Sequence, residues 1–143
     1  MQFTLAGDLS ELRQLSDEIA RFCQSNGLGS DVEFDLNLVL EELFTNTLKH
    51  GGGEGASEGA RIVLELDGED VVVEYSDQGA AFNPLEAPEV DLSAPLASRA
   101  SGGLGIHLVR QTMQDLEYQR AEGWNRLTMR RPVVETSPKV AFQ

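Results

Sequence analysis

The sequence predicts an α/β fold: a two-layer α+β sandwich with a mixed, mostly antiparallel sheet and helices on one face of it. The first observation is the order of periodic segments, which reads β-α-α-β-β-α-β-β along the chain. The second is a pair of β-branched runs, "RIVLEL" and "DVVVEYSD", separated by the turn "DGED". The third is length, because 143 residues suit one domain that buries its own core.

The N-terminal half should supply one strand and two helices. Residues 2–7, "QFTLAG", are typical of a short strand, and Asp8 and Ser10 are candidate caps for a helix that runs to about residue 25. The break "NGLGSD" separates this helix from a second one over residues 31–50. The following "GGGEGASEGA" is too rich in glycine to hold a packed element.

The C-terminal half should supply two hairpins, a long loop and a third helix. The loop, residues 83–103, contains three prolines and little periodicity, and loops of this length are usually functional. The helix follows it as "LGIHLVRQTMQ". We expect one domain over residues 1–131 and a loose tail over 132–143. The hairpin strands are expected at residues 61–66, 70–77, 116–120 and 125–131.

Composition narrows the classes of partner. The net charge of −13 would be repelled by nucleic acid or an anionic membrane, so neither is expected to bind directly, and a basic protein partner fits better. No apolar run approaches the ~20 residues that span a bilayer, and the N-terminus lacks the pattern of a secretion signal. A single cysteine, Cys23, allows no intrachain disulfide and fits a cytoplasmic location.

The segment "EELFTNTLKH" places polar side chains in a line on the second helix. With Glu42 at the origin of a helical wheel, Asn46 lies at about 40° and Lys49 at about −20°. Asp35 lies near this line, at about 20°. The apolar residues gather on the opposite side, so one face should pack on the sheet. They are Leu36, Leu40, Leu43 and Phe44, with Thr47 among them and Leu48 at the margin.

Two interpretations of this line stay open. Solvated faces of this kind are common on amphipathic helices. However, asparagine is a poor helix former, so a function for Asn46 would explain its position within the helix. Its amide oxygen is a suitable ligand for Mg²⁺ that already holds phosphate oxygens. The carboxylate of Glu42, one turn away, is a candidate acceptor of a proton from a nucleophile.

Two further segments carry similar alternatives. "EYSDQGAAFNP" ends a strand with Asp77 and reaches Gly79 two residues later, which is either a polar turn or a site for the exocyclic amine of a purine. "SGGLGIHLVR" places Gly102, Gly103 and Gly105 at the start of a helix, as plain hinges or as a phosphate site. It matches neither the P-loop nor the dinucleotide-binding fingerprint.

In this order, the motifs E-x-x-x-N, D-x-G-x-x-F-N-P and G-G-L-G-I-H-L-V-R resemble the GHKL ATP-binding superfamily. The chain most resembles its anti-sigma-factor serine/threonine kinases, from the first strand to "WNRLTMRR". The resemblance implies the GHKL fold and ATP with Mg²⁺ as cofactors. It also implies that residues 83–103 form a lid over the phosphates, with Arg99 as a loose candidate for contact.

The same resemblance assigns the site. Glu42 would be the general base that prepares a serine hydroxyl, and Asn46 would hold Mg²⁺. Asp77 would bind adenine with help from Thr128. Ala80 and Ala81 stand where the family has its second glycine. The implied ATP-binding residues are Asn46, Lys49, His50, Asp77, Gly79, Phe82, Gly103, Leu104, Gly105 and Thr128.

The resemblance further implies a bacterial anti-sigma factor that phosphorylates a small STAS-type anti-sigma antagonist and switches partners with a sigma factor. A homodimer is an expectation of the same resemblance. The main alternative is a non-catalytic ATP-binding regulatory module that sequesters a protein partner. An ATPase fragment of the gyrase or mismatch-repair type would need a following transducer domain. A plain α/β interaction domain without nucleotide is the remaining alternative.

Overall fold

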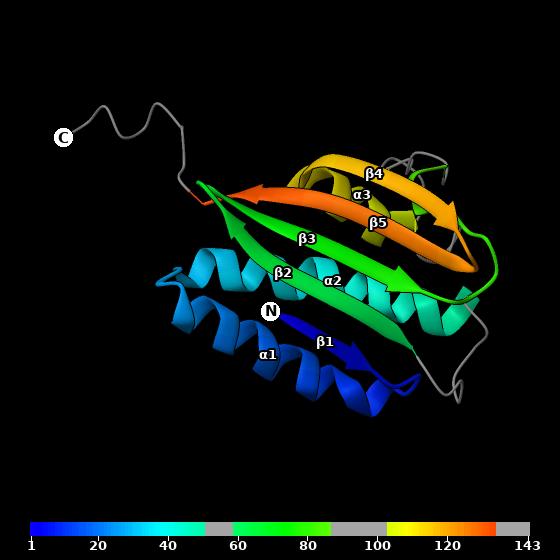
Figure 1. Ribbon diagram of the computed structural model, residues 1–143, viewed down its shortest axis with the longest axis horizontal. Helices are drawn as coiled ribbons and strands as arrows, with labels where there is room; N and C mark the ends of the chain where they lie inside the picture. The colour runs from blue at the N-terminus through cyan, green and yellow to red at the C-terminus, as the bar shows by residue number, and fades with distance from the viewer. Residues whose placement is uncertain (51–58, 87–102, 134–143) are drawn as a thin grey trace.

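The computed structural model describes residues 1–50, 59–86 and 103–133. They form one five-stranded sheet with strand order β1-β2-β3-β5-β4 and, as Figure 1 shows, three helices on one face of it. The helices are α1 (Leu12–Ser25), α2 (Ser30–His50) and α3 (Gly103–Thr112). The strands are β1 (Gln2–Leu5), β2 (Ala60–Asp67), β3 (Asp70–Asp77), β4 (Gln114–Ala121) and β5 (Trp124–Pro132).

The two-layer α/β prediction is confirmed, and so is the predicted order of the elements. Within the described strands the sheet is antiparallel at all four pairings, where a mixed sheet was expected. The β2–β3 and β4–β5 neighbours are hairpins, which fixes their direction. Between β3 and β5 the chain passes through α3 and β4 and returns in the opposite direction.

The helix cap predicted at Asp8 is present, although it begins a short 3-10 turn and not α1 itself. Asp8 accepts a hydrogen bond from the Ser10 amide at 2.9 Å, so it caps a short 3-10 turn, η1 (Leu9–Glu11), immediately before α1. A second 3-10 turn, η2 (Pro84–Glu86), follows β3. Most of the expected lid, residues 87–102 including Arg99, and the expected tail from residue 134 lie outside the described residues.

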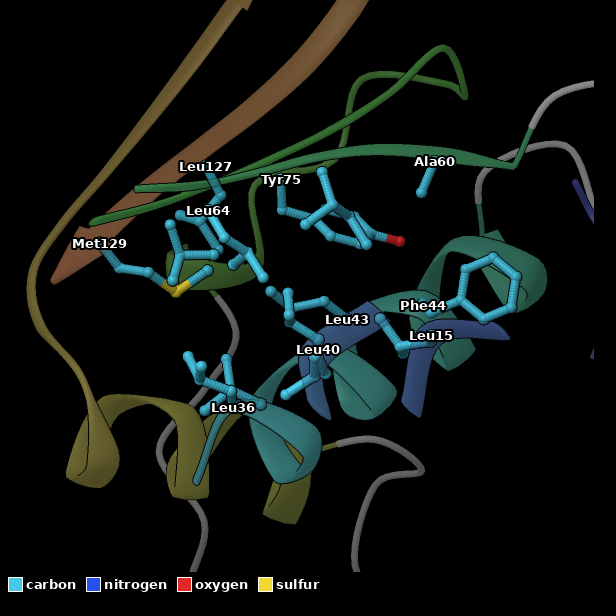
Figure 2. Packing of buried hydrophobic residues seen from close by; sticks show 14 of the residues in the cluster. Leu15, Leu36, Leu40, Leu43, Phe44, Ala60, Leu64, Tyr75, Leu127 and Met129 are labelled. Carbon is cyan, nitrogen blue, oxygen red and sulfur yellow. The ribbon is translucent and has the colours of Figure 1, made fainter. Parts of the chain in front are cut away.

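The core lies between the sheet and the three helices, with α2 contributing its largest share. On the sheet, Tyr75 of β3 stands between Ile62 and Leu127, its registered neighbours on β2 and β5. Figure 2 shows the helical leucines beneath these strand side chains. The predicted apolar face of α2 is buried, which confirms that this face packs on the sheet. Its members are Leu36, Leu40, Leu43, Phe44 and Thr47.

This packing brings the second half of α2 beneath the end of β3. Because every third or fourth residue of α2 is held in the core, the positions of Glu42 and Asn46 are fixed relative to Asp77, the last residue of β3. Cys23 of α1 is a core residue, and burial, with a smaller contribution from Glu33, raises the pKa of its thiol to about 11. None of the helices in the described segments is long and apolar enough to span a bilayer.

Two phenylalanines on α2 test this arrangement. Phe44 is fully buried whereas Phe34 is 66% exposed. Phe44→Ala should lower the free energy of unfolding by about 3–5 kcal/mol because it leaves a cavity. Phe34→Ala should change it by no more than about 0.5 kcal/mol. Urea denaturation measures both, and equal losses in the two variants would contradict the placement of α2.

Candidate nucleotide site

A pocket with a largely apolar wall and a few buried polar side chains opens where α2, the end of β3 and β5 meet. The space between its side chains is about 430 Å³, including the part that is open to solvent. Among its lining residues are three that the sequence analysis selected, Asn46, Asp77 and Phe82. The structure therefore brings together Asn46, the candidate ligand for Mg²⁺, and Asp77, the candidate partner of adenine.

Asp77 is the centre of a hydrogen-bond network. The residue is 9% exposed, and its Oδ1 accepts from the Asn125 side-chain amide at 2.8 Å and from the Gly79 backbone N–H at 3.1 Å. Its Oδ2 accepts from the Thr47 hydroxyl at 2.9 Å. An ionised carboxylate has about four acceptor directions, so these three bonds leave one direction on Oδ2 for a ligand.

Thr47 is itself oriented by Tyr75. The two hydroxyl oxygens lie 2.6 Å apart, and Thr47 has a single hydrogen, which the Asp77 carboxylate attracts most strongly. Tyr75 therefore donates to Thr47, which donates to Asp77. Burial is the main cause that raises the pKa of the Tyr75 phenol, so it remains a protonated donor. The hydroxyls of Tyr75 and Thr47 therefore determine the side from which Asp77 Oδ2 accepts its hydrogen bond.

Asn46 carries a buried polar atom without a partner. The side chain is 6% exposed, and its Oδ1 makes no hydrogen bond within the described structure. Leaving such an atom unsatisfied costs about 1–3 kcal/mol. An amide oxygen is a hard ligand that suits Mg²⁺. The described residues contain no cluster of three or more His, Cys, Asp or Glu for a metal, so phosphate oxygens and water would complete the coordination.

Glu42 lies against the start of α3. A Cβ built on Gly105 would overlap the carboxyl carbon and both carboxyl oxygens of Glu42. Only a glycine at residue 105 therefore leaves room for the carboxyl at this place. Burial raises the pKa of Glu42, and the charge of Lys49 partly offsets this rise. A carboxylate whose pKa is raised accepts a proton more readily than an ordinary glutamate.

The remaining candidate residues lie around these groups. Lys49 is exposed at the end of α2, and Phe82 is partly exposed at the pocket wall. His50 is the last residue of α2, and Gly103 and Leu104 form the first residues of α3. The side chains of His50 and Leu104 lie outside the described part of the chain.

The structure does not bring Thr128 to Asp77. Its neighbours on β5, Leu127 and Met129, are buried toward the helices, and side chains alternate between the faces of a strand. Thr128 therefore faces the opposite surface, between Glu74 and Glu117 of the neighbouring strands. The position assigned to Thr128 beside Asp77 is occupied instead by Asn125.

Sequence reasoning missed three residues of the network: Thr47, Tyr75 and Asn125. A signal for the third was present, because Asn125 shares its strand face with Leu127 and Met129 and is the polar residue on an apolar face. Asp35, which lies near the same line of α2 as Glu42, has a structural role. Its carboxylate pairs with the Arg131 guanidinium at 2.8 Å and ties α2 to β5.

The antiparallel sandwich has a pocket lined by the amide of Asn46 and the carboxylate of Asp77, and a glycine-opened helix lies against Glu42 beside it, which fits a nucleotide-binding domain. The chain belongs to the family described as the histidine kinase-like ATPase domain, whose model matches residues 5–131. This confirms the GHKL prediction, and ATP is the nucleotide that the family implies.

Two curated relatives are similar to the chain at the level of sequence. Serine/threonine-protein kinase BtrW of Bordetella bronchiseptica is 33% identical over 98 residues, which cover 68% of this chain and 69% of BtrW. Serine-protein kinase RsbW of Halalkalibacterium halodurans is 30% identical over 106 residues, which cover 69% of this chain and 64% of RsbW. Both names agree with the predicted resemblance to anti-sigma-factor kinases.

A solved structure is similar at the level of the fold. The crystal structure of the RsbU and RsbW domains of a Mycobacterium tuberculosis protein matches with a TM-score of 0.68. The match covers 96% of this chain and 33% of that protein, at 14% identity. It supports the fold alone.

The contact between Glu42 and Gly105 is open to a direct test. In Gly105→Ala the new methyl group should push the flexible end of Glu42 outward, with a stability change of only about 1 kcal/mol or less. Since burial is the main cause of the raised pKa of Glu42, its titration should move down toward the ordinary glutamate range. Carboxyl NMR titration measures this, with Glu42→Gln to assign the signal. An unchanged titration would refute the contact.

Proposed function

We propose that the protein is an Mg-ATP-dependent serine/threonine kinase that acts as an anti-sigma factor and phosphorylates a small STAS-type antagonist. The observation that supports this most strongly is the convergence of Asn46 and Asp77 on one pocket, with Glu42 one helical turn away against the start of α3. The kinase names of BtrW and RsbW support it independently.

Phosphoryl transfer requires positioning, charge neutralisation and a base, and little covalent chemistry from the protein. Asp77 Oδ2 has an open acceptor direction for the exocyclic amine of adenine. The first backbone N–H groups of a helix have no partner within the helix, so those from Gly103 to Gly105 at the start of α3 suit the phosphates. Asn46 Oδ1 would hold Mg²⁺, and the ion would supply neutralisation of phosphate charge.

Glu42 then acts on the protein substrate. Its carboxylate takes the proton from the serine hydroxyl as the serine oxygen bonds to the γ-phosphorus and the bond to ADP breaks. The pocket lies on a chain with a net charge of −13, so local donors must hold the triphosphate against the general field. The same charge favours a basic surface on the sigma factor and disfavours nucleic acid. A homodimer and a cytoplasmic location complete the proposal.

Glu42→Gln should lower the rate of phosphoserine formation on the cognate antagonist by about 10²–10⁴-fold, because the amide cannot accept the proton. The dissociation constant for Mg-ATP should change little. Glu41→Gln is the matched control, since Glu41 is the exposed neighbour on the same helix. Phosphate transfer is measured with labelled ATP and binding by calorimetry.

Each outcome of this experiment has a defined meaning. Transfer at the normal rate by Glu42→Gln would remove Glu42 as the base. Wild-type protein that binds Mg-ATP and forms no phosphoserine would instead be a non-catalytic regulatory module. Absence of ATP binding in the wild type would overturn the nucleotide site itself.

Asn46→Leu should separate stability from function. Leucine has the same branching pattern, with methyl groups in place of the amide atoms, and removes the unpaired buried oxygen, so the free energy of unfolding should stay equal or rise by about 1 kcal/mol. The stimulation of ATP binding by Mg²⁺ should be lost. Urea denaturation and calorimetry with Mg²⁺ or EDTA measure the two effects. A variant with unchanged Mg²⁺ dependence would show that Asn46 is not the metal ligand.

A further inference from the structure

The side chain of Asn125 forms four hydrogen bonds around the pocket, and the proposed function gives it no role. Its side chain is 8% exposed at the start of β5. Its Nδ2 donates to Asp77 Oδ1 at 2.8 Å and to the Ala80 carbonyl at 2.9 Å. Its Oδ1 accepts from the Phe82 backbone N–H at 3.3 Å and from the Tyr118 hydroxyl.

The chemistry of these partners fixes the orientation of the amide. The Asp77 carboxylate and the Ala80 carbonyl can only accept, whereas the Phe82 N–H can only donate. A flipped amide would therefore oppose like groups at three contacts. Two donated and two accepted bonds are also the full capacity of an asparagine side chain. Asn125 is thus saturated and has no group left for a ligand.

Three of the four bonds reach a stretch that lies 43 to 48 residues away in sequence, and the fourth reaches the adjacent strand of the same hairpin. They link β5 to the end of β3, to the loop over residues 79–82, and to Tyr118 of β4. A fifth bond, from the Arg120 guanidinium to the Gly79 carbonyl at 2.7 Å, holds the same loop. Ala80 and Phe82 both line the pocket. The side chain of Asn125 bonds the backbone of both residues and so holds this part of the pocket wall in place.

We propose that Asn125 is a positioning residue for purine recognition. It occupies Oδ1 of Asp77 and holds the loop over residues 79–82, so that Oδ2 is the carboxylate oxygen with a free acceptor direction in the pocket. This assignment makes Asn125 responsible for the preference for a 6-amino purine over a 6-oxo purine. It rests on the proposed ATP-binding function.

Asn125→Asp is the sharpest variant because it keeps the shape and removes both N–H donors. It also places a second carboxyl beside Asp77, and two adjacent carboxyls favour sharing a proton. The shared proton lies between the two carboxyls, on the Oδ1 side of Asp77, and the Ala80 carbonyl loses its donor. The orientation of the carboxylate and of the loop over residues 79–82 is therefore no longer fixed, and Oδ2 is no longer held as the acceptor for the 6-amino group. ATP affinity should fall at least tenfold, and the ratio of ATP to inosine triphosphate affinity at least fivefold.

A merely structural cross-link would behave differently. Loss of stability alone would weaken both nucleotides equally and leave the ratio unchanged. Asn37→Asp is the matched control, since Asn37 of α2 also donates its amide to a backbone carbonyl, that of Glu33, at 2.9 Å. The control should keep both affinities within about twofold. If Asn125→Asp fails to fold, Tyr118→Phe removes one bond to Asn125 Oδ1 and should lower the ratio by a smaller factor.

Calorimetry with the full chain and Mg²⁺ measures both affinities, and hydrogen exchange at the Phe82 amide reports the loop. Faster exchange at Phe82 together with a reduced ratio supports the proposal. An unchanged ratio in a folded Asn125 variant overturns it while the ATP site stands. Failure of wild-type protein to bind ATP overturns the proposed function and this inference together, so the two failures are distinguishable.

Discussion

The buried carboxylate of Asp77 is the constraint on which the rest of the pocket depends. A charge at the inner end of β3 would be costly unless hydrogen bonds compensate for its lost hydration. Donors come from three directions: Thr47 on α2, Asn125 on β5 and the backbone of Gly79. The need to satisfy this one group therefore fixes helix, strand and loop relative to one another, and it leaves a single open acceptor direction toward the pocket.

Helix α2 contributes residues to both the core and the site. The packing of its apolar face therefore determines where its polar side chains lie. Successive turns of α2 bury leucines against the sheet, and the same turns carry Glu42, Asn46 and Thr47 toward α3 and β3. Asp35 and Arg131 fasten the other end of the helix to β5 at 2.8 Å. Movement of α2 would displace Glu42 and Asn46 and would break the hydrogen bond from Thr47 to Asp77 at the same time.

The sequence predicted elements well and contacts across the sheet poorly, for identifiable reasons. The 3.6-residue period of α2 and the β-branched runs of β2 and β3 depend on local pattern, so both were recognisable. The pairing of Asn125 with Asp77 depends on strand register, which no local pattern fixes. Thr128, which the family resemblance places beside Asp77, lies on the opposite face of β5. The contact between Glu42 and Gly105 joins residues from two helices and required the packed fold.

Helix α2 carries two features, one in the pocket and one beside it, that a domain selected for stability alone would lack. Asn46 Oδ1 has no partner, and the Glu42 carboxyl is withdrawn from water against α3 rather than extended into solvent. Each raises the free energy of the ligand-free protein, whereas a bound cation and a substrate hydroxyl would relieve both. Both lie on one face of α2, and Asn46 Oδ1 is the single buried side-chain polar atom without a partner among the described residues, which indicates that this pocket is built for a ligand.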